Sequence, residues 1–169
     1  MLKFIFICVG LLIPICSYAD EHTTPFTSEG LNTLKGKDIC SIEGEFSGEL
    51  GVYLDGHKDY SVVYRERDGV IAAFLLSHPT NNCGKVEAVL NVTKTIKKEE
   101  FIEFQCYTKH EGGTGWEKWG HVIGLVNNDK GNKRFVTARV AWRVNVEKKR
   151  FEKISKKTEC DTIGYADGE

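Results

Sequence analysis

The chain has 169 residues, with 23 Lys and Arg against 24 Asp and Glu, a formal net charge of −1 at pH 7, and six cysteines. The length suits a single domain. Because the basic residues are interleaved with acidic ones and form no long basic stripe, the sequence argues against nucleic acid as a partner.

Residues 1–19 have the pattern of a secretory signal peptide. Lys3 is followed by an apolar run at 4–15, and Ser17-Tyr18-Ala19 places small residues at the two positions that a signal peptidase reads. The run is shorter than the roughly 20 residues that span a bilayer. We therefore expect cleavage after Ala19, a secreted or periplasmic protein, and no membrane span in the mature chain. A retained anchor or lipid attachment is the alternative.

Residues 20–38 are polar and show no sustained hydrophobic period. With Pro25 and Gly30, this segment is interpreted as an extended N-terminal arm with room for one short helical turn at 31–34. The sequence pattern typical of β-strands begins at Ile39.

Two Asp-Gly turns define the next strands. Asp55-Gly56 and Asp68-Gly69 each separate two apolar runs, and such a dipeptide is a strong hairpin signal because both turn residues need positive φ. The pattern predicts a meander. The run 70–76 lacks alternation, so we expect it to be buried on both faces or covered by the N-terminal arm.

Residues 83–106 contain the clearest strand pair. Apolar residues alternate with polar ones from Val86 to Val92, and again from Ile102 to Cys106. We interpret these two stretches as the arms of one hairpin. A hairpin is marginal in isolation, so its apolar face must pack on further strands.

Four cysteines remain after the signal peptide is removed, and they predict two disulfides in an oxidising compartment. They allow three connectivities, of which we favour Cys83 with Cys106, closing the hairpin, and Cys40 with Cys160, joining the ends of the domain. The cysteines lack a Cys-x-x-Cys pair and a histidine at ligand spacing, so neither a zinc site nor another cofactor is predicted.

The last strand pair brackets a turn at 127–132. A register centred near residue 130 places the following pairs opposite each other: Trp119 and Trp142, His121 and Val140, Ile123 and Ala138, Leu125 and Val136. Trp119, His121 and Trp142 then share one face, where His121 could contact a ligand or act as an acid or base. The alternative is a core or rim histidine that makes one hydrogen bond.

The loop at 109–118 is a second candidate site. It is rich in glycine and contains His110 and Trp116. Exposed aromatic side chains on such loops are frequent binding anchors. Alternatively, Trp116 folds back over the end of the domain.

Together these elements predict an all-β fold, an antiparallel meander of about eight or nine strands stapled by disulfides. We expect a small barrel or a strongly curved sheet, with a two-sheet sandwich as the alternative. A single β domain would occupy 39–160, followed by a flexible C-terminal tail at 161–169.

No nucleophile beside a base is visible in the sequence, which favours a non-catalytic binding or inhibitory domain whose partner is another protein or a small ligand. One alternative is a small-ligand carrier or small hydrolase that uses the pocket at Trp119, His121 and Trp142. The other is an envelope-associated structural protein.

Overall fold

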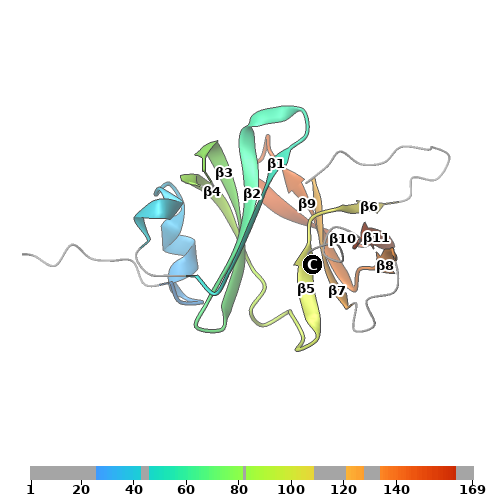
Figure 1. Ribbon diagram of the computed structural model, residues 1–169. Helices are drawn as coiled ribbons and strands as arrows, with labels where there is room; N and C mark the ends of the chain where they lie inside the picture. The colour runs from blue at the N-terminus through green and yellow to red at the C-terminus, as the bar shows by residue number, and fades with distance from the viewer. Residues whose placement is uncertain (1–25, 43–45, 82, 109–120, 128–133, 163–169) are drawn as a thin grey trace, which may run out of the picture.

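The computed structural model describes residues 26–42, 46–81, 83–108, 121–127 and 134–162. These residues form two 3-10 helices and eleven β-strands in three antiparallel sheets (Figure 1). The helices are η1 (Gly30–Leu34) and η2 (Ile39–Ser41). The strands are β1 (Gly48–Leu54), β2 (His57–Arg67), β3 (Val70–Thr80), β4 (Cys83–Asn91), β5 (Glu100–Glu103), β6 (Cys106–Thr108), β7 (Val122–Asn127), β8 (Phe135–Thr137), β9 (Val140–Asn145), β10 (Arg150–Ile154) and β11 (Thr158–Asp161). Within the described residues, no helix is long and apolar enough to cross a membrane.

The first sheet has the strand order β1-β2-β3-β4, the second β10-β9-β7-β5 and the third β6-β11-β8. The predicted meander is confirmed for the first sheet, where each strand pairs with the next along the chain. Asp68 and Gly69 connect β2 to β3 with φ of 52° and 74°, the positive values that this turn requires. The predicted all-β, antiparallel and disulfide-containing fold is therefore confirmed.

Three hydrophobic clusters lie between the layers of the molecule. The main core separates the first and second sheets and includes Leu75 and Trp142. On the outer face of the first sheet, Phe74 packs with Leu31 and Leu34 from the N-terminal segment. Because Phe74 and Leu75 point to opposite faces, β3 is buried on both sides, as its lack of alternation predicts. A third cluster lies between the second and third sheets.

The two larger sheets face each other across the main core (Figure 1). Across the described ranges the three sheets do not close into one barrel. The arrangement is thus closer to the two-sheet sandwich, which the sequence offers as the alternative, than to the predicted small barrel.

The predicted hairpin at 83–106 is not formed. β4 pairs with β3, and residues 92–99 lead the chain across to the second sheet, where β5 pairs with β7. Alternation identifies the residues that share a face of a strand, but it does not select the partner strand. The two alternating stretches therefore belong to different sheets.

The disulfide pairing needs correction for the same reason. Cys40 bonds to Cys83, and Cys106 bonds to Cys160. The predicted pairs, Cys83 with Cys106 and Cys40 with Cys160, followed from the hairpin and are wrong. Cys83 begins β4 beside the N-terminal segment, whereas Cys106 in β6 lies directly opposite Cys160 in β11.

The register of the last strand pair also differs from the prediction. Ile123 lies opposite Trp142, and Leu125 lies opposite Val140. The reason is that β8 leaves the second sheet and pairs with β11 in the third. The chain between β7 and β9 is therefore not the single tight turn that the prediction assumed.

The predicted signal peptide at 1–19 and the predicted loop at 109–118 lie wholly outside the described residues, as do most of the turn at 127–132 and most of the tail at 161–169. Of the predicted arm at 20–38, residues 30–34 form η1, whose Leu31 and Leu34 are buried.

Candidate functional site

The two facing sheets meet along two seams, which differ in structure. At the first, which we call the closed seam, β4 and β10 lie side by side. Glu87 on β4 accepts a hydrogen bond from Ser77 at 2.8 Å and pairs with Lys149 at 3.0 Å, just before β10. Burial raises the pKa of Glu87, but these two partners outweigh it and lower the pKa overall. The ionised carboxylate thus joins the two sheets.

At the other seam, β1 pairs only with β2, and β5 pairs only with β7 within the described chain. A cavity of about 570 Å³ lies between these two edges, and we call it the seam cavity. It is lined by Gly48, Glu49 and Leu50 of β1, Tyr64 and Glu66 of β2, Ile71 of β3, Ile96 of the 92–99 linker, and Glu100, Phe101 and Ile102 of β5. A volume of this size lies within the usual range for ligand pockets, about 300 to 1,000 Å³.

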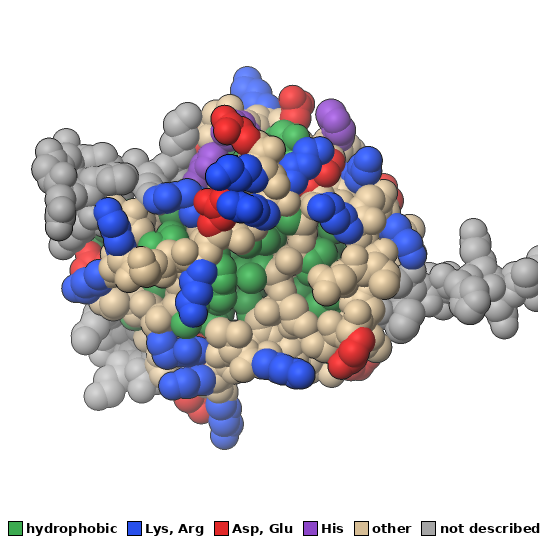
Figure 2. All heavy atoms as spheres, turned by 180° about the vertical axis from the view of Figure 1, so that it is seen from behind, with side chains coloured by type: hydrophobic (Ala, Val, Ile, Leu, Met, Phe, Trp, Pro, Cys, Tyr) green, Lys and Arg blue, Asp and Glu red, His purple; other side chains and the backbone are tan. Residues whose placement is uncertain are grey.

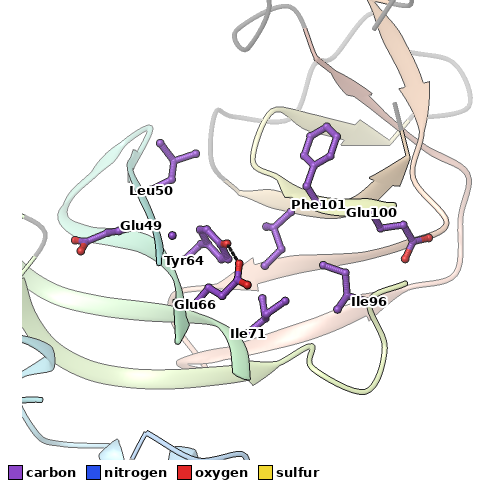
Figure 3. Close-up of a pocket in the computed structure, with 10 residues that line it drawn as sticks. Glu49, Leu50, Tyr64, Glu66, Ile71, Ile96, Glu100 and Phe101 are labelled. Atoms are coloured by element: carbon purple, nitrogen blue, oxygen red, sulfur yellow. Dashed lines mark hydrogen bonds between the residues drawn. The ribbon is translucent and has the colours of Figure 1, made fainter. Parts of the chain in front are cut away.

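Tyr64 and Glu66 form the polar centre of the seam cavity. The Tyr64 hydroxyl donates a hydrogen bond to Glu66 Oε2 at 2.7 Å, and both side chains point into the gap between the sheets, beside Ile71 and Ile96 (Figure 3). No basic side chain of the described chain pairs with the Glu66 carboxylate. This carboxylate therefore has hydrogen-bonding capacity left for a ligand.

Gly48 makes the position of Tyr64 possible. A Cβ atom at Gly48 would lie 2.5 Å from the Tyr64 hydroxyl oxygen, closer than non-bonded atoms approach each other. A side chain at position 48 would therefore require the Tyr64 side chain to shift from this position.

The other two carboxylates at the cavity are already paired and point away from it on opposite sides (Figure 3). Glu49 pairs with the buried guanidinium of Arg65 at 3.2 Å. Glu100 accepts a hydrogen bond from Arg139 at 2.6 Å, and this bond is the main cause of the lowered pKa of Glu100. Glu66 is consequently the carboxylate that a ligand in the cavity would meet.

The arrangement suits an apolar ligand that bears one cationic or hydrogen-bond-donating group. Leu50, Ile71, Ile96 and Phe101 would contact its apolar part. A cation beside Glu66 would form a charge-assisted hydrogen bond, which is stronger than a neutral one.

Two of the sequence-predicted site residues are described, and neither lines the seam cavity. Trp142 is 8% exposed and packs in the main core. His121 Nε2 donates to the Asp55 carbonyl at 2.9 Å, and its ring lies 5.3 Å from that of His57. His121 therefore joins the start of β7 to the turn between β1 and β2, a contact typical of a rim histidine. His110, Trp116 and Trp119 lie outside the described residues.

Sequence reasoning missed Leu50, Tyr64, Glu66 and Ile96. One signal was present: Val62, Tyr64 and Glu66 alternate along β2, so all three side chains share one face. A glutamate that continues an inward-facing apolar row is unusual, and it could have identified the polar centre of the site.

Among the described residues, no group of three His, Cys, Asp or Glu side chains could hold a metal ion. No family model matches the chain, and neither curated proteins nor solved structures gave a significant match.

Proposed function

We propose that this chain is a non-catalytic binding or inhibitory protein that works in a periplasm or outside the cell, and that it takes its ligand at the seam cavity. The observation that supports this proposal is the combination of apolar walls with Glu66, whose carboxylate has no basic partner among the described residues. Burying an apolar group there would provide binding free energy of roughly 25 cal/mol per Å² of apolar area, and Glu66 would orient the ligand.

The compartment follows from the cysteines. Two disulfides indicate an oxidising extracellular or periplasmic environment. The proposal adds a signal peptide at 1–19, cleaved after Ala19, as the means of export.

A small-ligand carrier is the second candidate function. The volume of the seam cavity, about 570 Å³, favours it because a drug-sized molecule would fit. The two candidates share the site and differ in the occupant: part of a protein partner in the first case, a free small molecule in the second.

Fluorescence titration of the oxidised protein with N-phenyl-1-naphthylamine, a neutral apolar probe with one N–H group, tests whether the seam cavity binds ligands. We expect saturable enhancement from one site. Ile96→Trp should abolish it, because the indole would fill the cavity from the linker. Phe135→Trp, on the exposed edge of the third sheet, is the control and should bind as the wild type does. Equal binding by the wild type and Ile96→Trp would refute the proposed site.

A further inference from the structure

The two edges of the first sheet differ in whether another segment of the described chain covers them. The outer edge of β4 is covered: Gly36 donates to the Val86 carbonyl at 2.7 Å, and Val86 donates to the Lys37 carbonyl at 2.9 Å. The Cys40–Cys83 disulfide fixes this covering segment to the start of β4. β1 forms the opposite edge and pairs with β2 alone within the described chain.

β1 also has few of the features by which natural proteins protect an edge strand. Its sequence, Gly-Glu-Leu-Gly-Val-Tyr-Leu, contains no lysine or proline, and its one register irregularity lies at the end, between Tyr53 and Leu54. Its single charge, Glu49, points out of the cavity (Figure 3). Leu50 is 37% exposed and Tyr53 57%, and they are two of the three exposed large apolar side chains in the described chain.

We propose that the ligand is an extended segment of a partner protein, which adds to the first sheet as a strand along β1 and inserts a basic side chain toward Glu66. The inference rests on the proposed function and names the class of ligand for the same cavity. Main-chain hydrogen bonds to β1 supply affinity in this mode of recognition, and alternate side chains supply specificity.

The geometry of β1 dictates the sequence pattern of the partner. Side chains of a strand alternate between its two faces, so every second residue of the added segment points into the seam cavity. Gly48 and Leu50 are two residues apart on the inward face, and Gly48 lies beside the Tyr64–Glu66 pair. The partner therefore presents a Lys or Arg next to Gly48 and an apolar residue next to Leu50, two positions apart.

Selection from a displayed library of random twelve-residue peptides on the oxidised protein tests this proposal. We expect enrichment of peptides with a basic and an apolar residue two positions apart. Peptides with the enriched sequences are then synthesised. Glu66→Gln should lower the affinity for these peptides roughly tenfold or more, because it removes a hydrogen bond to a charged group. Leu50→Lys should abolish binding, since its ammonium group would occupy the place of the peptide's cation. Phe135→Lys, the control at an exposed apolar residue of the third sheet, should leave binding unchanged.

N-methylation of alternate peptide amides separates strand pairing from side-chain contact. The methyl groups can be placed on either the odd-numbered or the even-numbered residues of the peptide. One of these two peptides should lose binding because its methylated amides are the N–H groups that face β1, while the other should still bind. Binding by both methylated peptides would overturn the proposal. Unchanged binding by Leu50→Lys and Glu66→Gln, or a library that yields no binder, would also overturn it. If the apolar probe still binds in that case, the proposed site stands and only the peptide inference fails; if neither binds, both fail.

Discussion

Glu103 is a buried carboxyl that accepts two hydrogen bonds on one of its oxygens. Its side chain is 2% exposed, and Oε1 accepts from the backbone N–H groups of Phe104 at 2.8 Å and Gln105 at 3.0 Å. Oε2 is buried without a hydrogen-bond partner. Burial raises the pKa of Glu103 above its ordinary value of about 4.5, and the nearby Asp161 acts in the same direction.

The raised pKa predicts how Glu103→Gln changes stability with pH. Because the pKa is higher in the folded than in the unfolded state, folding takes up a proton between the two values, and the free energy of unfolding falls as pH rises through that window. Gln keeps the acceptor oxygen but does not ionise. Urea denaturation should therefore show that the free energy of unfolding of the variant, relative to that of the wild type, is higher at pH 8 than at pH 4.

A matched control for this prediction is Glu147→Gln, at an exposed turn position. It should change stability by the same amount at both pH values. A Glu103→Gln effect that is equally independent of pH would mean that Glu103 ionises in the folded protein as it does in the unfolded chain.

At the scale of elements, Gly124 on β7 allows the third sheet to pack on the second. A Cβ atom at this position would lie 2.8 Å from Ala138 Cβ, 2.9 Å from Cys160 Sγ and 3.0 Å from Cys106 Sγ. Gly124→Ala should therefore cost about 1–3 kcal/mol of stability through overpacking, measured by urea denaturation. The double variant with Ala138→Gly should recover part of the loss, since it removes the closest contact. A fully stable Gly124→Ala would contradict this packing account.

The Cys40–Cys83 disulfide has a second structural role, because it holds residues 36–38 on the edge of β4. Replacing both cysteines by Ala should cost about 2–4 kcal/mol and uncover that edge. Analytical ultracentrifugation at several concentrations should then show more self-association than in the wild type. Replacing Cys106 and Cys160 should also reduce stability but should leave the association state as it was. Equal association by the two variants would show that the β4 edge is not what the disulfide protects.

The elements that could be predicted from sequence are those set by local conformation. The Asp68-Gly69 turn was predictable because positive φ at two adjacent residues favours Asp and Gly, and the burial of β3 on both faces was predictable because its apolar residues do not alternate with polar ones. The partners of β4 and β5 were not, because pairing between distant strands is decided by the packing of whole sheets. The disulfide pairing failed with that choice, and the Trp142 register failed because β8 pairs with β11 in the third sheet.

The candidate site was less predictable than the fold. The inward direction of Glu66 could be predicted from the alternation of β2. The cavity, however, exists only because β1 and β5 face each other without pairing with each other. No local pattern encodes that arrangement. Of the tryptophans predicted for the two candidate sites, Trp142 lies in the core, and Trp116 and Trp119 lie outside the described residues.

At the scale of the whole molecule, the charge is unevenly distributed. The face opposite to the view of Figure 1 shows more Lys and Arg than Asp and Glu side chains, around a central area of hydrophobic ones (Figure 2). Because the net charge of the chain is −1, the acidic side chains that balance this face lie elsewhere. Three acidic residues, Glu49, Glu66 and Glu100, line the seam cavity.

We propose that the two seams between the facing sheets have different roles: the β4–β10 seam joins the sheets, and the β1–β5 seam binds a ligand. Amide ¹H–¹⁵N NMR spectra recorded during titration with N-phenyl-1-naphthylamine test it most directly. We predict that the largest shift changes fall on β1, on residues around Ile96 and on β5, with little change on β4 and β10. Changes centred on His121 and Trp142, or on the closed seam, would contradict the account.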